Sequence, residues 1–368
     1  MSETSSMIEE SIQRILADQV DRKVLDAVEA GDWPHTLWNA LEQAGFTDIL
    51  GATDDESATQ WADAYPMFHA IGRYAAPVPL AETAVANHLI ARYGLPRRAG
   101  ALTFVDAGTG ATLSDGMLTL NATVVAVPWA SRAGALVVTA RVDGGQIVAL
   151  VDANAAGLQI ESGANLAGEP LDTVTFNECR TRTFKQVDRD IDLTVYGALI
   201  RAAMMAGAVE AVLVSAVEYA NERVQFGRPI GKFQAIQQSL AQLAGEATSS
   251  QCAALAAFSC VGEEPGRFET AVAKIRAGKA AGLAASIAHQ VHGAIGFTWE
   301  HTLHYATQRL WSWRAEYGTE AGWAAELGRA AIARRGAGFW SELTSHYSAG
   351  VPEAAAMTKT ADEAGAQR

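Results

Sequence analysis

Two segments of the sequence place polar side chains beside glycine turns, an arrangement that suits a phosphate-containing ligand. The first covers residues 223–237, Arg-Val-Gln-Phe-Gly-Arg-Pro-Ile-Gly-Lys-Phe-Gln-Ala-Ile-Gln. One long helical pattern ends here, a Gly/Pro turn follows, and a second helix begins. Arg223, Gln225 and Arg228 then lie beside exposed backbone, and guanidinium groups at a helix end are suited to a pyrophosphate. The alternative interpretation is a helical hairpin with coincidental charges.

The second segment, Gln-Val-His-Gly-Ala-Ile-Gly-Phe at residues 290–297, follows an Ala-rich helical pattern. Gly293 and Gly296 are three residues apart, and glycine lets the backbone approach a ligand closely. By itself this pattern also fits an ordinary glycine turn at the end of a helix.

Both segments resemble motifs of the acyl-CoA dehydrogenases. The first resembles the family signature Arg-x-Gln-Phe-Gly-x-Pro-Ile-x-x-Phe-Gln, and the second resembles the Gln-x-x-Gly-Gly-x-Gly-Phe loop, with Ala294 in place of its second glycine. The resemblance implies FAD as the cofactor, held across a subunit interface through its diphosphate and adenosine. The residues that it implies for this contact are Arg223, Gln225, Phe226, Gln290, Gly293 and Gly296.

The resemblance covers nearly the whole chain and implies an α+β fold. We expect an N-terminal helical domain (1–98), a middle antiparallel β domain (99–190), a C-terminal four-helix bundle (191–350) and a flexible tail (351–368). The middle part departs from the family. Between Thr103 and Pro170 we find nothing comparable to the Thr-Glu-Pro-x-x-Gly-Ser-Asp loop that holds the flavin ring and the substrate.

The catalytic base of the family is also missing, although α,β-dehydrogenation needs a carboxylate to remove the α proton. A gapless count from Phe297 to the family's Tyr-Glu-Gly-Thr segment puts the base position at Tyr317. Glu316 is one residue early, and on a helix that offset rotates the side chain by about 100°. The alternative family position is Gly197, whose neighbours are not acidic. Glu316 is therefore only a weak candidate.

The spacing of apolar residues predicts the elements that position these motifs. Residues 8–93 read as helices, with breaks at 31–34 and 75–79. Asp32 is predicted to cap the helix that starts near Pro34. The apolar face of that helix would be Leu37, Trp38 and Leu41.

Beyond residue 100, short apolar runs separated by turn signals predict strands at 136–142, 146–151 and 173–176. No stretch between them is long enough for the crossover helix of a parallel sheet, so antiparallel pairing is expected. Long helices are predicted again at 193–225, 233–261, 268–292 and 301–313.

Other residues carry weaker signals. Cys179, Cys252 and Cys260 lack the close spacing of a zinc or redox motif and read as reduced thiols. His289 and His292 lack a third ligand, and the acid and imidazoles of residues 300–304 read as structural, so no metal site is predicted.

Composition limits the classes of partner. The chain has 368 residues, 49% of them hydrophobic, and a net charge of −13. This charge disfavours nucleic acid and anionic membranes. The N-terminus is polar and acidic, and no run of about 18 apolar residues is found. We therefore expect a cytoplasmic protein with no membrane or nucleic-acid contact.

Together these patterns favour one half of a heteromeric acyl-CoA dehydrogenase. The chain resembles the smaller, base-lacking subunits of actinobacterial two-plus-two complexes that oxidise steroid-CoA thioesters. In that interpretation a catalytic partner subunit supplies the base, and an electron-transfer flavoprotein is a possible acceptor. Two alternatives stay open: a self-sufficient homotetramer that uses Glu316 as its base, and a non-catalytic scaffold subunit.

Overall fold

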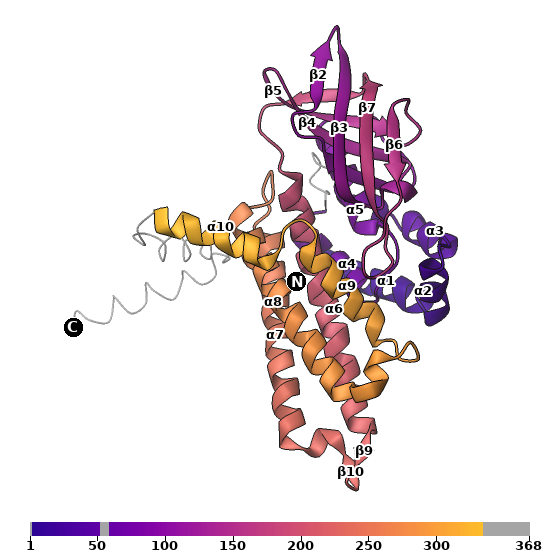
Figure 1. The fold of residues 1–368 in the computed structure, drawn as a ribbon, viewed down its shortest axis with the longest axis vertical. Helices are drawn as coiled ribbons and strands as arrows, with labels where there is room; N and C mark the ends of the chain where they lie inside the picture. The colour runs from indigo at the N-terminus through magenta and orange to yellow at the C-terminus, as the bar shows by residue number, and fades with distance from the viewer. Residues whose placement is uncertain (1, 52–58, 334–368) are drawn as a thin grey trace, which may run out of the picture.

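The computed structural model describes residues 2–51 and 59–333. Figure 1 shows a β-rich part at one end of the molecule, the N-terminal helices beside its base, and a bundle of long helices that reaches the opposite end. This order of helices, strands and helices confirms the predicted α+β fold class. The predicted tail, and the end of the predicted bundle domain at residue 350, lie outside the described residues.

The N-terminal part is helical because apolar residues recur on one face of each segment. Its elements are α1 (Glu3–Gln19), α2 (Arg22–Glu29), α3 (His35–Gln43), η1 (Phe46–Asp48), α4 (Trp61–Arg73) and α5 (Leu80–Arg92). Leu37, Trp38 and Leu41 are buried as predicted. The predicted cap was wrong: Pro34 occupies the capping position without a side-chain hydrogen bond, and Asp32 lies two residues too early to reach the first turn.

The middle part consists of two four-stranded sheets. The first contains, in spatial order, β1 (Leu102–Asp106), β4 (Ala135–Val142), β5 (Gly145–Asp152) and β8 (Phe184–Val187). The second contains β2 (Ala111–Ser114), β3 (Met117–Pro128), β7 (Leu171–Thr181) and β6 (Leu158–Glu161). Buried side chains such as Leu118, Leu136 and Val174 form a separate core in this part of the chain.

One strand pair contradicts the predicted antiparallel arrangement. β1 pairs with β4 in parallel, with Leu102 opposite Ala135. A parallel pair needs a long crossover, which is usually a helix. Here β2 and β3 make that crossover, and because they belong to the other sheet, no helix is required.

The C-terminal part confirms the four predicted helices. They are α6 (Leu193–Glu222), α7 (Gln234–Ser259), α8 (Arg267–His292) and α9 (Leu303–Ala315). The short strands β9 (Val224–Gln225) and β10 (Arg228–Pro229) form a hairpin between α6 and α7, at the far end of the bundle (Figure 1). A further helix, α10 (Glu320–Ala333), projects sideways from the bundle.

The N-terminal and C-terminal helices share one continuous core. Phe68 of α4, Val85 of α5, Ile200 of α6 and Phe258 of α7 all belong to it. The crossing of α4 and α6 is especially close. A Cβ added at Gly72 would lie 1.7 Å from the carbonyl oxygen of Met204, and one added at Gly207 would lie 1.9 Å from that of His69. The two glycines therefore let the helix backbones touch.

Among the described residues, α6 is the one helix long and apolar enough to cross a membrane, which the sequence prediction did not anticipate. However, 78% of its most apolar window is buried inside the protein. It also carries the fully buried Arg201. These features are typical of the central helix of a folded core.

His88 of α5 leads to a prediction about acid stability. Its Nδ1 lies 3.2 Å from the carbonyl oxygen of Leu50, so Nδ1–H donates there. Its Nε2 is buried and has no partner in the described part of the chain. Burial lowers the pKa of His88 from 6.5 to about 4. The unfolded chain therefore binds the proton first, and stability is lost as pH falls from about 6.5 to about 4.

The expected loss from this residue is about 3 kcal/mol at most. Because His88→Gln does not titrate, its free energy of unfolding, measured by urea denaturation, should fall less across that pH range. His35→Gln, at an exposed position, serves as the control. Equal pH slopes for the His88 variant and the wild type would rule out this role.

Candidate functional site

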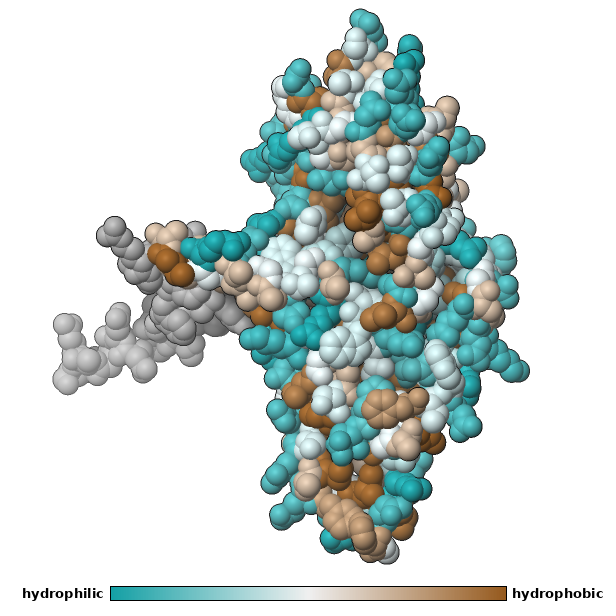
Figure 2. All heavy atoms as spheres, in the orientation of Figure 1, coloured by the Kyte–Doolittle hydropathy of each residue, from teal (hydrophilic) through white to brown (hydrophobic). Residues whose placement is uncertain are grey.

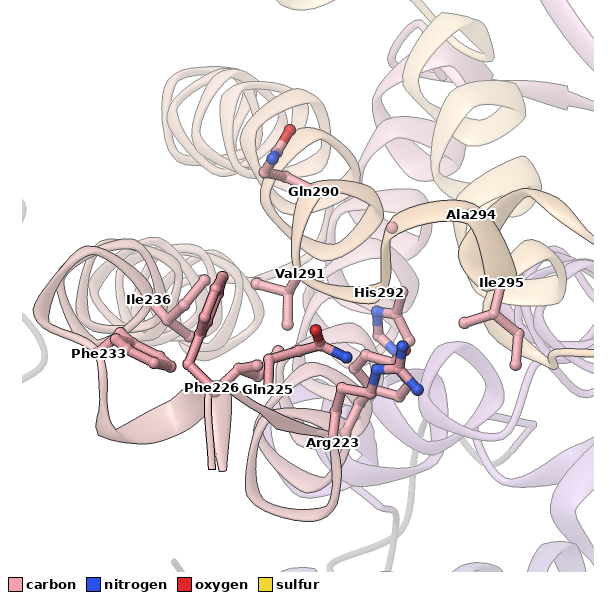
Figure 3. Close-up of a pocket in the computed structure, with 13 residues that line it drawn as sticks. Arg223, Gln225, Phe226, Phe233, Ile236, Gln290, Val291, His292, Ala294 and Ile295 are labelled. Atoms are coloured by element: carbon pink, nitrogen blue, oxygen red, sulfur yellow. The ribbon is translucent and has the colours of Figure 1, made fainter. Parts of the chain in front are cut away.

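A cavity of about 590 Å³ lies at the far end of the bundle, between the β9–β10 hairpin and the turn after α8 (Figure 3). The residues that line it are Tyr219, Arg223, Gln225, Phe226, Ile230, Phe233, Ile236, Gln290, Val291, His292, Gly293, Ala294 and Ile295. The structure thus brings together two motifs that are far apart in the sequence.

Five of the six residues predicted from the sequence line this cavity: Arg223, Gln225, Phe226, Gln290 and Gly293. Gly296 is buried beneath the same turn instead. A Cβ at this position would lie 2.8 Å from the Cβ of His292. Gly296 therefore allows the turn to pack against the end of α8.

The hairpin that carries Phe226 has an unusual backbone. Phe226 and Gly227 have φ values of +52° and +78°, which fit a two-residue hairpin turn with both central residues left-handed. A left-handed conformation is costly for a residue with a side chain, by about 1–2 kcal/mol. The Phe226 ring is nevertheless 92% exposed in this chain. Strain that presents an exposed aromatic ring is typical of a contact site.

The cavity is cationic although the protein is acidic. Among the described residues, Arg223 has no ion-pair partner and no carboxylate lines the cavity. Arg228 lies nearby, with its guanidinium 4.3 Å from the centre of the Phe233 ring. Unpaired guanidinium groups are suited to phosphate oxygens. These residues therefore fit the diphosphate of a dinucleotide such as FAD.

Exposed aromatic and aliphatic side chains surround this region. A second cavity of about 570 Å³ shares Gln290 and Gly293 with the first and is also lined by Phe297 and Trp311. Phe297 is 75% exposed and the neighbouring Trp299 is 64% exposed. Figure 2 shows hydrophobic residues gathered at the end of the molecule that carries the hairpin. Exposed apolar patches of this kind mark interaction surfaces.

The two positions that the family resemblance gives for the base face each other. A Cβ at Gly197 would lie 2.2 Å from Cδ1 of Tyr317, so the tyrosine ring fills the space next to the glycine. Tyr317 also stacks on Phe104, with 5.7 Å between ring centres. Burial raises the pKa of its hydroxyl. Neither position can remove a proton at neutral pH.

Glu316 has a different environment from the one predicted. α9 ends at Ala315, and Glu316 follows it in an extended conformation, so the argument from helical rotation was wrong. Both carboxylate oxygens are occupied. Oε2 lies 2.7 Å from Nε of Arg201, and Oε1 accepts a hydrogen bond of 3.1 Å from Asn165. To act as a base, Glu316 would first have to break its ion pair with Arg201.

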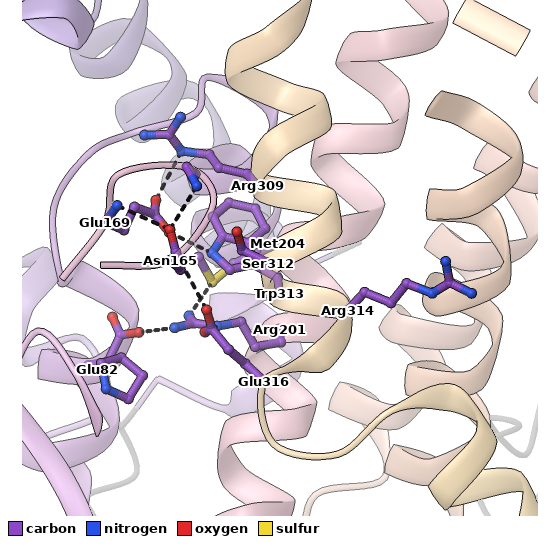
Figure 4. A network of polar contacts seen from close by, with 12 residues as sticks. Glu82, Asn165, Glu169, Arg201, Met204, Arg309, Ser312, Trp313, Arg314 and Glu316 are labelled. Carbon is purple, nitrogen blue, oxygen red and sulfur yellow. Dashed lines mark hydrogen bonds and ion pairs between the residues drawn. The ribbon is translucent and has the colours of Figure 1, made fainter. Parts of the chain in front are cut away.

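Glu316 belongs to a buried polar network that the sequence analysis missed (Figure 4). Arg201 also donates to Glu82 at 2.6 Å, and both side chains are 1% exposed. Burial alone raises the pKa of Glu82 and lowers that of Arg201, but the neighbouring carboxylates reverse the effect on Arg201 and raise its pKa.

The network continues into the β domain. Glu169 lies 3.0 Å from Arg309 and accepts a hydrogen bond of 2.9 Å from the indole of Trp313. Glu169 and Asn165 come from the loop before β7, whereas Arg309 and Trp313 belong to α9. One ion pair and two hydrogen bonds therefore attach this loop to the bundle. One signal in the sequence could have revealed this network: Arg201 lies inside the apolar α6 segment, and a buried arginine almost always has a partner.

No metal site is found among the described residues, since no group of three His, Cys, Asp or Glu side chains has suitable geometry. The histidines after residue 288 instead contact aromatic neighbours: His289 stacks on Phe297, and His304 meets Trp299 edge to face.

Comparison with known proteins assigns the family. The model of the acyl-CoA dehydrogenase C-terminal domain matches residues 194–336. The acyl-CoA dehydrogenase IpdE2 of Mycobacterium tuberculosis is 30% identical over 315 residues, which cover 83% of this chain and 91% of the relative.

Solved structures agree. A variant of the Tcur3481–Tcur3483 steroid ACAD is 26% identical, with a TM-score of 0.79 over 91% of this chain and 99% of that chain. The ChsE4–ChsE5 complex of Mycobacterium tuberculosis is 22% identical, with a TM-score of 0.78 over 90% of this chain and 98% of that chain, and shares the fold. The chain belongs to the acyl-CoA dehydrogenase family, whose dehydrogenases are oxidoreductases acting on CH–CH groups.

Proposed function

We propose that this chain is the cofactor-binding half of a heteromeric acyl-CoA dehydrogenase. It holds the diphosphate and adenosine of FAD across an interface with a catalytic partner subunit. The observation that carries the proposal is a combination within one chain: the cationic cavity is open, whereas the base position is filled by Tyr317 against Gly197.

The roles of the residues follow from their positions. Arg223 would pair with the diphosphate, and Gln225 and Gln290 would hydrogen-bond to polar atoms of the nucleotide. Exposed Phe226 would pack against the partner or the cofactor. When bound, FAD accepts the hydride that leaves the β carbon of the acyl-CoA thioester. The partner supplies the carboxylate that removes the α proton.

The named relatives suggest the substrate class and the assembly. One similar structure is described as a steroid ACAD, and another is a complex of two different chains. We therefore propose a steroid side-chain CoA thioester as substrate, a heterotetramer as the assembly, and an electron-transfer flavoprotein as the electron acceptor. The exposed side chains Phe226, Phe297 and Trp299 would be covered by the partner.

The test is to express the chain alone and together with the product of its neighbouring reading frame, and to measure bound FAD per mole of protein. We expect flavin only in the complex, at about half the number of chains, because two different chains form each site. A yellow and active protein from this chain alone would overturn the proposal and favour the self-sufficient enzyme with Glu316 as base.

Arg223→Ala provides the matching prediction within the complex. Loss of a charge-assisted contact to phosphate costs about 1.5–3 kcal/mol, so FAD should bind about ten- to hundredfold more weakly. The measurement is the dissociation constant for FAD in the reconstituted apo complex. Arg189→Ala, which removes an exposed arginine paired with Glu263, should leave it unchanged. Unchanged affinity in the Arg223 variant would favour the scaffold alternative.

A further inference from the structure

Four histidines gather around the turn that closes the cationic cavity. His289 and His292 are in the last turn of α8, and His301 and His304 flank the start of α9. The His292 and His301 rings lie 4.5 Å apart, and His292 stacks on Tyr219 of α6 at 4.6 Å. Of these four residues, only His292 lines the cavity itself.

The hydrogen bonds of His292 define its uncharged state. Nδ1 lies 2.7 Å from the carbonyl oxygen of Ala288 and must donate its hydrogen there. Nε2 lies 3.3 Å from the hydroxyl of Ser215, which can donate to it. Nε2 is therefore the atom that would accept a proton. Ser215 could then reverse its role and accept a hydrogen bond from the charged ring.

Neutral and basic groups face His292. From α6, Ser215 and Tyr219 contact it, and the cationic Arg223 after this helix lines the same cavity. From α8 and the following turn it meets His289 and His301. Burial lowers the pKa of His292; the hydrogen bond to the Ala288 carbonyl opposes this effect in part, and the two neighbouring imidazoles add to it.

Acidic side chains near these histidines in the sequence of the packed elements, such as Glu218 and Glu222 of α6 and Glu300 before α9, lie outside the lining of the cavity. Glu29 of α2 interacts with His304 and with Arg309 of α9, whereas no carboxylate lines the cavity in the described part of the chain. An anion in the cavity would therefore place a negative charge in the space that His292 lines, and it would stabilise the imidazolium.

We infer that the cavity binds its anionic ligand together with one proton, which His292 holds on Nε2. This inference rests on the proposed function, because it takes the FAD diphosphate as the ligand. A dianionic diphosphate and one proton from solvent enter together, so the charge of the complex changes by −1 rather than by −2. Affinity for the ligand then rises as pH falls, over the range in which the free protein has a neutral His292 and the complex has a charged one.

The experiment uses the apo complex of this chain with its partner and titrates it with FAD at several values between about pH 5.5 and pH 8. The FAD diphosphate diester does not itself titrate in this range. We expect affinity to increase by about tenfold from about pH 7.5 to about pH 5.5. Calorimetry at about pH 6.5, in two buffers with different ionisation enthalpies, should show net proton uptake on binding.

His292→Gln is the decisive variant because its amide can still donate to the Ala288 carbonyl but does not take up a proton. Its FAD affinity should show a flatter pH dependence, and its proton uptake should disappear. His35→Gln, at the exposed start of α3, should behave like the wild type. His301→Gln tests the neighbouring imidazole: loss of uptake in that variant, with uptake kept in His292→Gln, would overturn the assignment.

The two hypotheses fail in different ways. If FAD affinity is independent of Arg223 at every pH, the proposed function fails. If affinity depends on Arg223 but has the same pH profile in the wild type and in His292→Gln, only the proton linkage fails. Should His292→Gln not assemble with the partner, His292→Asn, with the same readout of proton uptake, replaces it.

Discussion

Arg201→Met should lower the free energy of unfolding by about 3–5 kcal/mol, because it leaves two buried carboxylates without their cation. Glu82 and Glu316 lie 2.6 Å and 2.7 Å from the guanidinium and have almost no contact with solvent. A methionine fills similar space but provides no charge. Urea denaturation and the midpoint of thermal unfolding measure the loss.

The pH dependence of this variant identifies the cause. Burial raises the pKa of Glu82 even with Arg201 present, and without Arg201 the folded state should bind protons more readily than the unfolded chain. Stability of the variant should therefore recover as pH falls toward about 5. The triple variant with Glu82→Gln and Glu316→Gln should recover most of the loss at neutral pH.

A matched control removes a surface arginine. Arg141 pairs with Asp190, and both side chains are 55% exposed. Exposed ion pairs contribute little, so Arg141→Met should change stability by less than about 1 kcal/mol. An Arg201 variant as mild as this control would show that the network contributes little to stability.

Gly207→Ala should destabilise the protein, whereas the same change at Gly245 should stabilise it. The new methyl group at position 207 would overlap the carbonyl oxygen of His69, which belongs to the backbone of α4 and cannot rotate away. The helices must separate, at a cost of about 1–3 kcal/mol or more. Gly245, in the middle of α7, has nothing within 4 Å of the added Cβ.

At Gly245, alanine improves helix propensity by about 0.5–1 kcal/mol without a steric penalty. The same Gly-to-Ala change should therefore lower the free energy of unfolding at position 207 and raise it at position 245. Thermal unfolding of the two proteins side by side is the measurement. If Gly207→Ala matched or exceeded the wild type in stability, the close crossing of α4 and α6 would be disproved.

Local patterns were sufficient to predict most of the helices and five of the residues that line the cavity. The Gly/Pro turn after Arg223 and the glycines after His292 are encoded in short segments, so their conformations follow from nearby residues. The face formed by Leu37, Trp38 and Leu41 was likewise visible in the spacing of apolar residues. Asp32 failed as a cap because propensity does not fix a helix start to within a residue.

The remaining features depend on contacts between distant segments. Parallel pairing of β1 with β4 is decided by which sheet the intervening strands join, and no residue in either strand signals that choice. Arg201 and Glu316 are an ion pair only because α6 and the chain after α9 meet in the folded protein. The packing of Tyr317 against Gly197 also depends on two distant segments that meet in the folded protein. Neither residue alone predicts this contact.

The shared helical core implies an order of events at the ribosome. α4 and α5 leave the exit tunnel before the β domain, yet they pack against α6, which is synthesised after it. The β domain has a core of its own and can fold as soon as it emerges. Until α6 is synthesised, side chains such as Phe68 and Val85 lack their packing partners on that helix. This exposes the nascent chain to aggregation or to chaperone binding. The β domain is thus expected to fold before the helical core, although the first helices of that core are synthesised earlier.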